Sequence, residues 1–383
     1  MRICVVGLGN IGYNLFQLLS EKFPGMVTGV DVNEELVTRL RQVGHDVVAD
    51  YESLTDIDMW LMAVSTGKRG ENLFGAFERM HIRPGSLISI ESTLPPGTMV
   101  RVRDFMEEKG FTLGLDLFLI HVPHRVMFGV DQTVCDTPRV IGAFTEQCLA
   151  RGRQFYAPLV PKLVEVEDVR IVEVSKVIEN VKRYVDVAFA QEIYRYCQAR
   201  DLDFESLRVA VNSKSNVALL GVDWGIGGEC LPKDMDFLRL VFGSPLLEGA
   251  VSADAQYRQQ LVDQVGKDQL VLVRGISYKT GVKDIKHSRG VDLVLALEAK
   301  GTTVWVEDPL FTPVELAALG FRPYVGAPAC EGEFGSPVDL SPTKDAGLVE
   351  HGEDDEYRPQ IVIDRGKALA PEFLPKTRRQ KHG

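Results

Sequence analysis

The sequence lacks the cysteine patterns of a metal site or of a disulfide framework. Its six cysteines are scattered, with no CxxC pair and no histidine cluster at the spacing of zinc ligands. No apolar run approaches the ~20 residues that a helix needs to span a bilayer. The net charge is -11, and no long basic stripe offsets it. These absences predict a cytoplasmic protein with reduced thiols and no metal, whose partner is neither nucleic acid nor a membrane.

What the sequence does contain, in its first 165 residues, is an alternation of apolar runs and amphipathic stretches. The apolar runs lie at residues 3–6, 27–30, 60–64 and 87–90, and residues 11–22 form an amphipathic stretch between the first two. Strands that alternate with helices build a parallel sheet covered on both faces. We therefore expect a first α/β domain here.

A long helix and a second α/β region follow. Residues 172–199 contain neither Gly nor Pro, and from residue 270 strand-like runs at 270–273 and 303–306 flank a helical stretch at 291–300. The long helix has apolar residues at three- and four-residue spacing, which predicts a single apolar stripe. The stripe comprises Val174, Val177, Ile178, Val181, Val185 and Phe189. Residues 327–357 are predicted to be loop, and the basic tail 376–383 to be frayed.

The first strand runs into the motif Gly7-Leu8-Gly9-Asn10-Ile11-Gly12, which opens a helix. Its glycines allow a tight turn, close approach of a pyrophosphate and packing of helix on strand, while the helix start offers N–H groups to phosphate. Asp31 follows Gly12 by nineteen residues, at the end of the second strand. Its carboxylate can accept ribose hydroxyls and would repel a 2′-phosphate. A glycine turn alone occurs in unrelated folds, but this combination predicts a Rossmann domain that binds NAD.

The long helix also carries Glu173, Lys176 and Asn180, which fall within a sector of roughly 60° away from the apolar stripe. A lysine and an asparagine one turn apart can direct donors at one oxygen and stabilise a developing negative charge. The same spacing is also typical of a solvated helix face. Spacing alone leaves both interpretations open.

The most unusual segment is residues 227–234, Gly-Gly-Glu-Cys-Leu-Pro-Lys-Asp. Gly227 and Gly228 allow a ligand to approach the backbone, and Pro232 predicts the start of a helix. Cys230 would then lie at a positive helix end, which favours the thiolate and makes it a candidate nucleophile. The alternative is a small buried hydrophobic residue, as expected for Cys4, Cys148 and Cys197.

With these residues in hand, the chain resembles the UDP-glucose/GDP-mannose dehydrogenase family, the nucleotide-sugar dehydrogenases, over about residues 1–310. The glycine motif is shared with many families, whereas four other motifs are specific in combination. They are Glu91-Ser92-Thr93 with Pro96-Gly97-Thr98, the E-x-x-K-x-x-x-N spacing of Glu173, Lys176 and Asn180, the G-G-x-C-x-P-K-D loop at 227–234, and Ser277-Tyr278-Lys279 with Asp284 and Ser288.

The resemblance implies an α/β fold with two Rossmann-like parallel-sheet domains joined by a long central helical segment. Residues 1–165 would be the NAD-binding domain, and residues 166–262 a central helical domain that dimerises and carries the cysteine loop. Residues 263–383 would bind the nucleotide of the sugar substrate. We therefore expect a homodimer.

The resemblance also implies the chemistry. Members of the family oxidise a sugar C6 alcohol to a carboxylate with two NAD, through a thiohemiacetal and a thioester on the cysteine, here Cys230. Lys176 and Asn180 would hold the oxyanion, and Asp234 and Thr93 would order the water and the reacting oxygen. The implied cofactor-binding set is Gly7, Gly9, Asn10, Ile11, Gly12, Asp31, Ser65, Thr66, Thr93 and Lys286. The implied substrate-binding set is Arg125, Val126, Lys176, Gly227, Gly228 and Lys279.

One departure affects the last step. His124 stands where the family usually has the glutamate assigned to thioester hydrolysis, and at an ordinary pKa of about 6.5 an imidazole can serve as a base. Three hypotheses stay open: full oxidation to the uronate, oxidation that stops at an aldehyde or ketone, and a nucleotide-binding family member without turnover. UDP-glucose, a UDP-N-acetylhexosamine and GDP-mannose are all compatible substrates, and a UDP-sugar is favoured.

Overall fold

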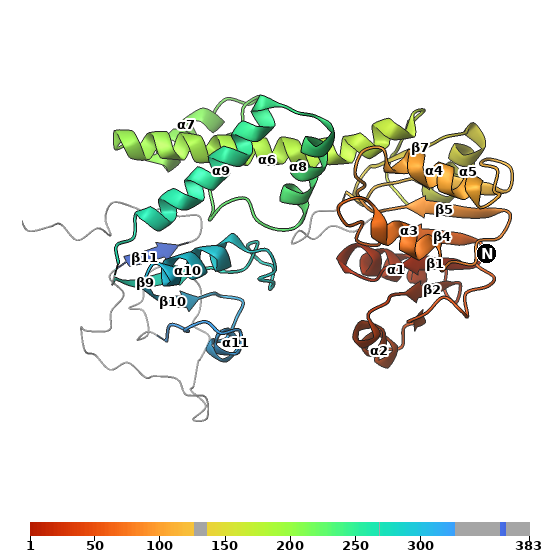
Figure 1. Ribbon diagram of the computed structural model, residues 1–383, viewed down its shortest axis with the longest axis horizontal. Coiled ribbons are helices and arrows are strands. Elements are labelled where there is room, and N and C mark those ends of the chain that lie inside the picture. Colours follow the sequence, from red (N-terminus) through yellow and green to blue (C-terminus); the bar gives the residue numbers. More distant parts are fainter. Residues whose placement is uncertain (126–135, 268, 326–360, 365–383) are drawn as a thin grey trace, which may run out of the picture. The chain divides into compact units, whose positions relative to one another are not determined.

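The computed structural model describes residues 1–125, 136–267, 269–325 and 361–364 (Figure 1). Residue contacts divide the chain into two compact units. The first combines Met1–Lys182 with Lys233–Gly243, and the second combines Arg183–Pro232 with Ser244–Gly383. The predicted loop at 327–357 and the tail at 376–383 lie outside the described residues. The division into three domains at residues 165 and 262 stays a prediction.

The first unit is built on an eight-stranded sheet with the order β3-β2-β1-β4-β5-β6-β7-β8. All neighbouring strands are parallel except β6 and β7, whose antiparallel pairing the sequence pattern did not predict. The predicted run at 60–64 is a strand displaced slightly toward the N-terminus. The strands are β1 (Ile3–Val6), β2 (Val27–Val30), β3 (Val47–Val48), β4 (Met59–Met62), β5 (Ser86–Ile90), β6 (Leu117–His121), β7 (Arg139–Ala143) and β8 (Leu163–Val166).

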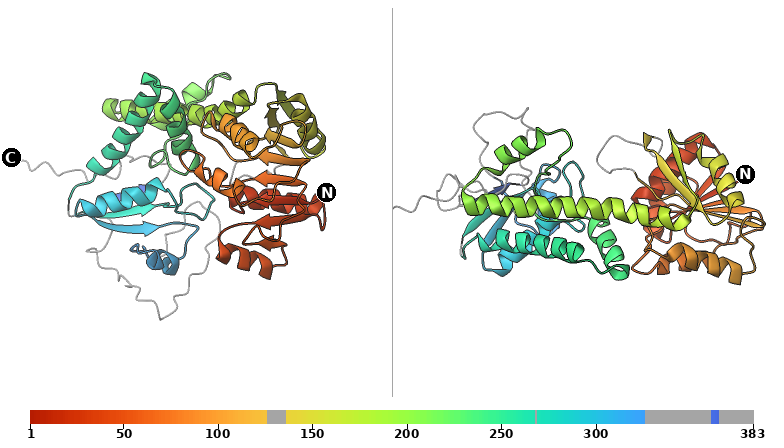
Figure 2. Two further views of the ribbon diagram at one scale, coloured as in Figure 1. Left: turned by 45° about the vertical axis from the view of Figure 1, so that its right-hand side comes forward. Right: turned by 90° about the horizontal axis from the view of Figure 1, so that it is seen from above.

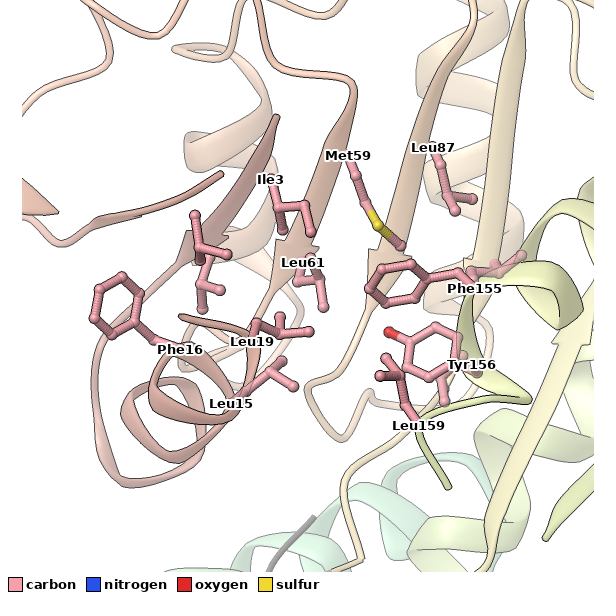
Figure 3. Close-up of a cluster of buried hydrophobic side chains, with 14 of the residues drawn as sticks. Ile3, Leu15, Phe16, Leu19, Met59, Leu61, Leu87, Phe155, Tyr156 and Leu159 are labelled. Atoms are coloured by element: carbon pink, nitrogen blue, oxygen red, sulfur yellow. The ribbon is translucent and has the colours of Figure 1, made fainter. Parts of the chain in front are cut away.

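Helices cover both faces of this sheet, as predicted for strands that alternate with helices. They are α1 (Asn10–Lys22), α2 (Glu34–Gln42), α3 (Glu71–Phe77), α4 (Thr98–Glu108) and α5 (Glu146–Tyr156). Alternate residues of β1 and β4 enter two separate cores, one packed with α1 and α5 and the other with α3 and α4. Figure 3 shows the first core, in which Leu15 and Leu19 of α1 and Phe155 and Tyr156 of α5 gather with Met59 and Leu61 of β4.

The long helix predicted at 172–199 is α6 (Val169–Arg200), one uninterrupted helix of 32 residues (Figure 2). Its predicted apolar stripe is wrong in part. Val177 and Val181 are buried, whereas Ile178 is 45% exposed and Phe189 is 59% exposed. At 3.6 residues per turn, these two lie about 100° to 120° around the helix from Val177. The observed buried face is therefore narrower than the run of apolar letters suggested, and it continues through Tyr184 and Ala188.

The second unit repeats the α/β pattern on a smaller scale. Its sheet has the order β10-β9-β11, all parallel, and its core draws on α6, α9 and α10. This confirms the predicted second parallel-sheet region. Within the described residues, no helix has the length and apolar character needed to cross a membrane. The remaining elements are α7 (Phe204–Asn212), α8 (Cys230–Val241), α9 (Pro245–Asp263), β9 (Leu270–Arg274), α10 (Arg289–Ala299), β10 (Thr303–Glu307), α11 (Pro313–Ala318) and β11 (Ile361–Asp364).

Candidate active site

The glycine motif forms a tight connection between β1 and α1. Gly7 has φ +85°, and a side chain there would lie 2.9 Å from the carbonyl oxygen of Ala63. A Cβ on Gly12 would lie 1.8 Å from the carbonyl oxygen of Gly7, so the helix can pack here only without a side chain. Gly9 is different, because it is exposed and no atom lies within 4 Å of the position of its Cβ. The backbone at Gly9 is thus open to a ligand.

The start of α1 suits an anion. Gly9 is its N-cap, no side chain caps it, and its first turn, which begins with Asn10 and Ile11, contains no acidic residue. Asp31 lies beside this loop, where its Oδ2 accepts the N–H of Leu8 at 2.7 Å. Open N–H groups next to a fixed carboxylate match the phosphate and ribose of a dinucleotide. The residues present therefore fit NAD.

Two hydrogen bonds join the loop after β4 to the loop after β5, beside the glycine motif. Ser92 donates its hydroxyl to the carbonyl oxygen of Val64 at 2.6 Å, and Thr66 donates to the carbonyl oxygen of Thr93 at 3.1 Å. Thr66 is buried, Thr93 is half-buried and Ser65 is exposed. Of the predicted set, Ser65 and Thr93 thus keep part of their surface accessible, while the Thr66 side chain serves the loop itself.

A buried ion pair lies at the end of β5. Glu91 and Arg139 are both fully buried, and their charged groups are 2.5 Å apart. The Tyr156 hydroxyl also donates to Glu91, and Arg139 donates to the carbonyl oxygen of Val122. Burial, together with the charge of Glu91, raises the pKa of Tyr156 well above its ordinary value. Sequence reasoning missed Arg139 and Tyr156. The one available signal was the acidic Glu91 directly after an apolar strand.

His124 lies on the loop after β6 and is 4% exposed. Its N–H donates to the carbonyl oxygen of Glu91 at 3.0 Å, while its buried Nε2 has no hydrogen-bond partner among the described residues. Burial, and to a smaller extent the positive charges of Arg139 and Lys176, lower its pKa to about 3. The sequence-based expectation of an ordinary histidine is therefore wrong. His124 is a neutral imidazole and a weak base in this environment.

Arg125, the next residue, is turned toward α6. Its guanidinium lies 2.6 Å from the carboxylate of Glu179, and it donates to the carbonyl oxygen of Pro138 at 3.1 Å. These two contacts occupy part of its donor set, and its role in substrate binding stays a prediction. Val126 falls outside the described residues.

Glu173 does not belong to a solvated helix face. It is 1% exposed, and its carboxylate accepts the N–H of Gly97 at 2.6 Å and that of Met99 at 2.8 Å, at the start of α4. Burial raises the pKa of Glu173 to about 6, against the opposing effect of these N–H donors. The carboxylate thus joins α6 to the positive end of α4.

The structure brings Lys176, Asn180 and Asp234 together. Asn180 donates its amide to Asp234 at 2.5 Å, and the Lys176 ammonium lies 3.5 Å from the amide oxygen of Asn180. Asp234 is fully buried and also accepts Lys233 at 2.9 Å. Asp234 is 54 residues from Asn180 in sequence, so its place beside α6 comes from the fold. This polar group connects α6 to α8.

Cys230 is the first residue of α8 and is exposed. The predicted helix start at Pro232 is therefore confirmed, with Pro232 in the first turn and Asp234 one turn after Cys230. Cys4, Cys148 and Cys197 are buried, as expected. An exposed thiol at a helix start is the arrangement that favours thiolate character.

The two glycines before Cys230 meet protein rather than open space. Gly228 has φ +76°, and its N–H donates to the carbonyl oxygen of His287 at 3.0 Å. A Cβ on Gly227 would lie 3.0 Å from the same oxygen. Lys279 is half-buried and Lys286 is exposed, both on the segment between β9 and α10. The glycines are thus required for close packing against this segment, a reason that the sequence reading did not include.

The chain is similar in sequence to known proteins. Residues 170–245 match the family model "UDP-glucose/GDP-mannose dehydrogenase family, central domain", and residues 3–64 match the TrkA-N domain. A UDP-N-acetyl-D-mannosamine dehydrogenase of Campylobacter jejuni is 24% identical, over 79% of this chain and 84% of that protein. An NDP-N-acetyl-D-galactosaminuronic acid dehydrogenase of Ralstonia solanacearum is 26% identical, over 80% and 82%.

Solved structures show the same fold. A UDP-glucose dehydrogenase of Pyrobaculum islandicum has a TM-score of 0.72 at 23% identity, covering 85% of this chain and 86% of that one. The Pyrococcus horikoshii UDP-D-ManNAc dehydrogenase also has a TM-score of 0.72, at 22% identity over 81% and 84%. The TrkA-N match over residues 3–64 and the open glycine loop support the predicted NAD-binding domain. Residues 170–245 thus match the central domain of the UDP-glucose/GDP-mannose dehydrogenase family, and the chain as a whole is similar to nucleotide-sugar dehydrogenases.

Proposed function

We propose that this protein oxidises the C6 primary alcohol of a nucleotide-diphosphate sugar, foremost a UDP-sugar, to the carboxylate through a covalent intermediate on Cys230. The observation that carries the proposal is the 2.5 Å hydrogen bond from Asn180 to Asp234. It ties the Lys176 face of α6 to the helix whose first residue is Cys230. Relatives that cover about 80% of the chain and carry the names of UDP-sugar dehydrogenases support the substrate class.

The residues around the β1–α1 turn would hold NAD, which supplies the hydride acceptor for both oxidations. Gly9, Asn10 and Ile11 present backbone N–H groups at the start of α1, where a pyrophosphate gains from the helix dipole. Asp31 would accept the ribose hydroxyls, because its position is fixed by the Leu8 N–H. Thr93 and Ser65 retain accessible surface on the neighbouring loops.

Cys230 would act on the aldehyde that the first oxidation gives. Its thiolate forms a bond to C6, and the carbonyl electron pair moves to the oxygen, which gives a thiohemiacetal. Removal of a hydride from C6 leaves a thioester, and water then adds to it and expels the thiolate as the carboxylate forms. The capture holds the aldehyde in place between the two oxidations.

Lys176 is the residue best suited to stabilise the oxyanions. It is partly buried beside Asn180, and its ammonium group has three N–H donors. Its contact with Asn180, at 3.5 Å, and its ion pair with Glu179, at 3.7 Å, are both long. Asp234 would orient Asn180 and order the hydrolytic water. By the resemblance, Lys279 would contact the sugar nucleotide.

A second candidate is a two-electron oxidation that ends at the aldehyde or ketone, in which no thioester forms and His124 is not needed as a base. A base whose pKa is lowered to about 3 removes a proton from water far less readily than an ordinary imidazole. If His124 does take the place of the usual glutamate, its replacement should slow thioester breakdown only.

The test is the number of NADH formed per sugar across a panel of sugar nucleotides, with the product mass. Two NADH support full oxidation, one supports the second candidate, and none across the panel points to a binding protein without turnover. Cys230→Ser should give at most one NADH per sugar, because a hydroxyl is a poor nucleophile without a strong base. If Cys230→Ser makes full uronate at the parent rate, the covalent mechanism is wrong.

Variants of His124 separate the last step from the others. His124→Ala should leave the hydride transfers nearly intact while acylated Cys230 accumulates, which intact-protein mass spectrometry detects. His124→Glu restores the residue usual in the family and should keep or raise turnover. Unchanged acyl-enzyme levels in His124→Ala would mean that His124 only packs against its loop.

A further inference from the structure

A buried carboxylate on α9 lies directly beneath the turn that leads to Cys230. Asp254 is 2% exposed, and its Oδ1 accepts the backbone N–H of Ile226 at 2.7 Å. The same oxygen accepts the side-chain amide of Gln191 on α6 at 3.0 Å, and Oδ2 accepts Nε of Arg258 at 3.0 Å. All four residues belong to one unit of the chain. One carboxylate therefore joins two helices to the turn.

The turn is shaped to fit this carboxylate. Gly225 has φ +135°, and a Cβ there would lie 2.5 Å from Cδ of Arg258 and 3.3 Å from Oδ1 of Asp254. Only a residue without a side chain can rest so closely on the ion pair. The contact is thus made by the backbone of the turn and not by an incidental side chain.

The backbone of Ile226 is held at its carbonyl group as well. Its carbonyl oxygen accepts Nε of Arg289 at 3.0 Å, while its N–H is held by Asp254. Two residues further on, Gly228 is held by the carbonyl oxygen of His287, which itself has φ +57°. Because both backbone polar groups of Ile226, four residues before Cys230, are hydrogen-bonded, the turn has little freedom before the thiol.

We infer that Asp254 is a positioning residue for Cys230: it fixes the 225–228 turn and through it the thiol. The expected effect on kcat rests on the proposed function. The placement of the thiol does not, because alkylation measures it without turnover. Asp254 itself is buried beneath the turn and acts through Ile226.

The sharpest variant is Asp254→Asn, which keeps the size of the side chain. Ile226, Gln191 and Arg258 all present donors, so an amide with a single oxygen cannot satisfy them all, and its NH2 group would face another donor. The matched control is Gln260→Ala. Gln260 lies on the same helix and accepts Nε of Arg195 at 3.0 Å, so this variant loses a bond between α9 and α6 and not one to the turn.

Two readouts are compared, kcat with the sugar nucleotide and the rate of Cys230 alkylation by iodoacetamide followed by peptide mass spectrometry. In Asp254→Asn we expect kcat to fall about 100-fold, the effect of a displacement near 1 Å, with KM for NAD unchanged. The alkylation rate should change about threefold or more as the thiol leaves its place at the helix start. Gln260→Ala should match the parent protein in both readouts.

Should Asp254→Asn fold poorly by circular dichroism, Arg289→Met tests the same peptide from its more exposed side and should change the alkylation rate likewise. Parent-like alkylation in folded Asp254→Asn or in Arg289→Met would overturn the inference. Equal changes in Gln260→Ala would also overturn it, because they would mean a general loss of packing. If Cys230→Ser instead retains full turnover, the proposed function fails while the alkylation result still decides the role of Asp254.

Discussion

Acidification should destabilise the first unit through two buried histidines. His121 is fully buried, with Nδ1 2.9 Å from the carbonyl oxygen of Ile90, and burial lowers its pKa to about 4. His124 is also buried, and its pKa is lowered to about 3. Because both folded-state pKa values lie below the ordinary value of 6.5, the neutral forms stabilise the folded protein. This stabilisation is complete above pH 6.5 and is lost as the pH falls toward 4 for His121 and toward 3 for His124.

The size of the effect follows from proton linkage. At pH 5 the unfolded chain has protonated both imidazoles, while the folded unit has protonated almost neither. Each histidine then lowers the free energy of unfolding by about 2 kcal/mol relative to pH 7, and the pair by about 4 kcal/mol. His121→Asn and His124→Gln should each remove about 2 kcal/mol of that pH-dependent loss. The fixed cost of each substitution cancels, because each variant is compared with itself at two pH values.

The assay is native-state hydrogen exchange of peptides covering β5 and β6, corrected for the intrinsic pH dependence of amide exchange. His81→Asn, at an exposed position, is the matched control and should keep the pH dependence of the parent protein. The reasoning is refuted if the double variant and the parent lose the same stability between pH 7 and pH 5, within about 0.5 kcal/mol.

Two further predictions concern the cofactor and the assembly. Asp31→Ala should reduce the preference for NAD over NADP about tenfold or more in kcat/KM, since the ribose loses a charged acceptor and the 2′-phosphate loses a repelling charge; equal use of both cofactors by the parent would contradict this. The exposed Ile178 and Phe189 of α6 predict a homodimer, which Ile178→Glu with Phe189→Glu should dissociate because the charges would be buried without partners. Light scattering at micromolar concentration decides, and a single-chain mass for the parent would count against the dimer.

The sequence was most informative where the chemistry depends on neighbouring residues. The motif from Gly7 to Gly12 is local, and the carboxylate of Asp31 follows from the length of one strand–helix–strand unit. The same holds for Cys230, whose helix start could be predicted from Pro232. In each case the residues are close in sequence, and one turn or one helix fixes their positions relative to each other. Their arrangement can therefore be predicted without the tertiary fold.

The sequence was least informative where the environment of a residue comes from distant segments. Glu91 and Arg139 are 48 residues apart in sequence. Arg139 lies on β7, whose antiparallel pairing with β6 brings its guanidinium to Glu91 at the end of β5. His124 therefore seemed an ordinary base, since neither Arg139 nor Lys176 is near it in sequence. Glu173 lies on a helix face that spacing alone could not distinguish from a solvated one. Its true partner is the start of α4, more than 70 residues earlier.

The carboxylate of Glu173 has a consequence for where an anion can settle on the large sheet. Among α1, α2, α4 and α5, three helices already have an oxygen of the protein at their N-terminus: Asn33 caps α2, Thr145 caps α5, and Glu173 supplies an intact negative charge to α4. Of these four, α1, which begins after Gly9, has no capping side chain; the short helix α3 has none either, but it begins with the acidic Glu71. Of the four helix N-termini, that of α1 is therefore the one that can accept the phosphate of a dinucleotide. Selectivity for this position comes from the capping of the other three N-termini as well as from the shape of the glycine loop.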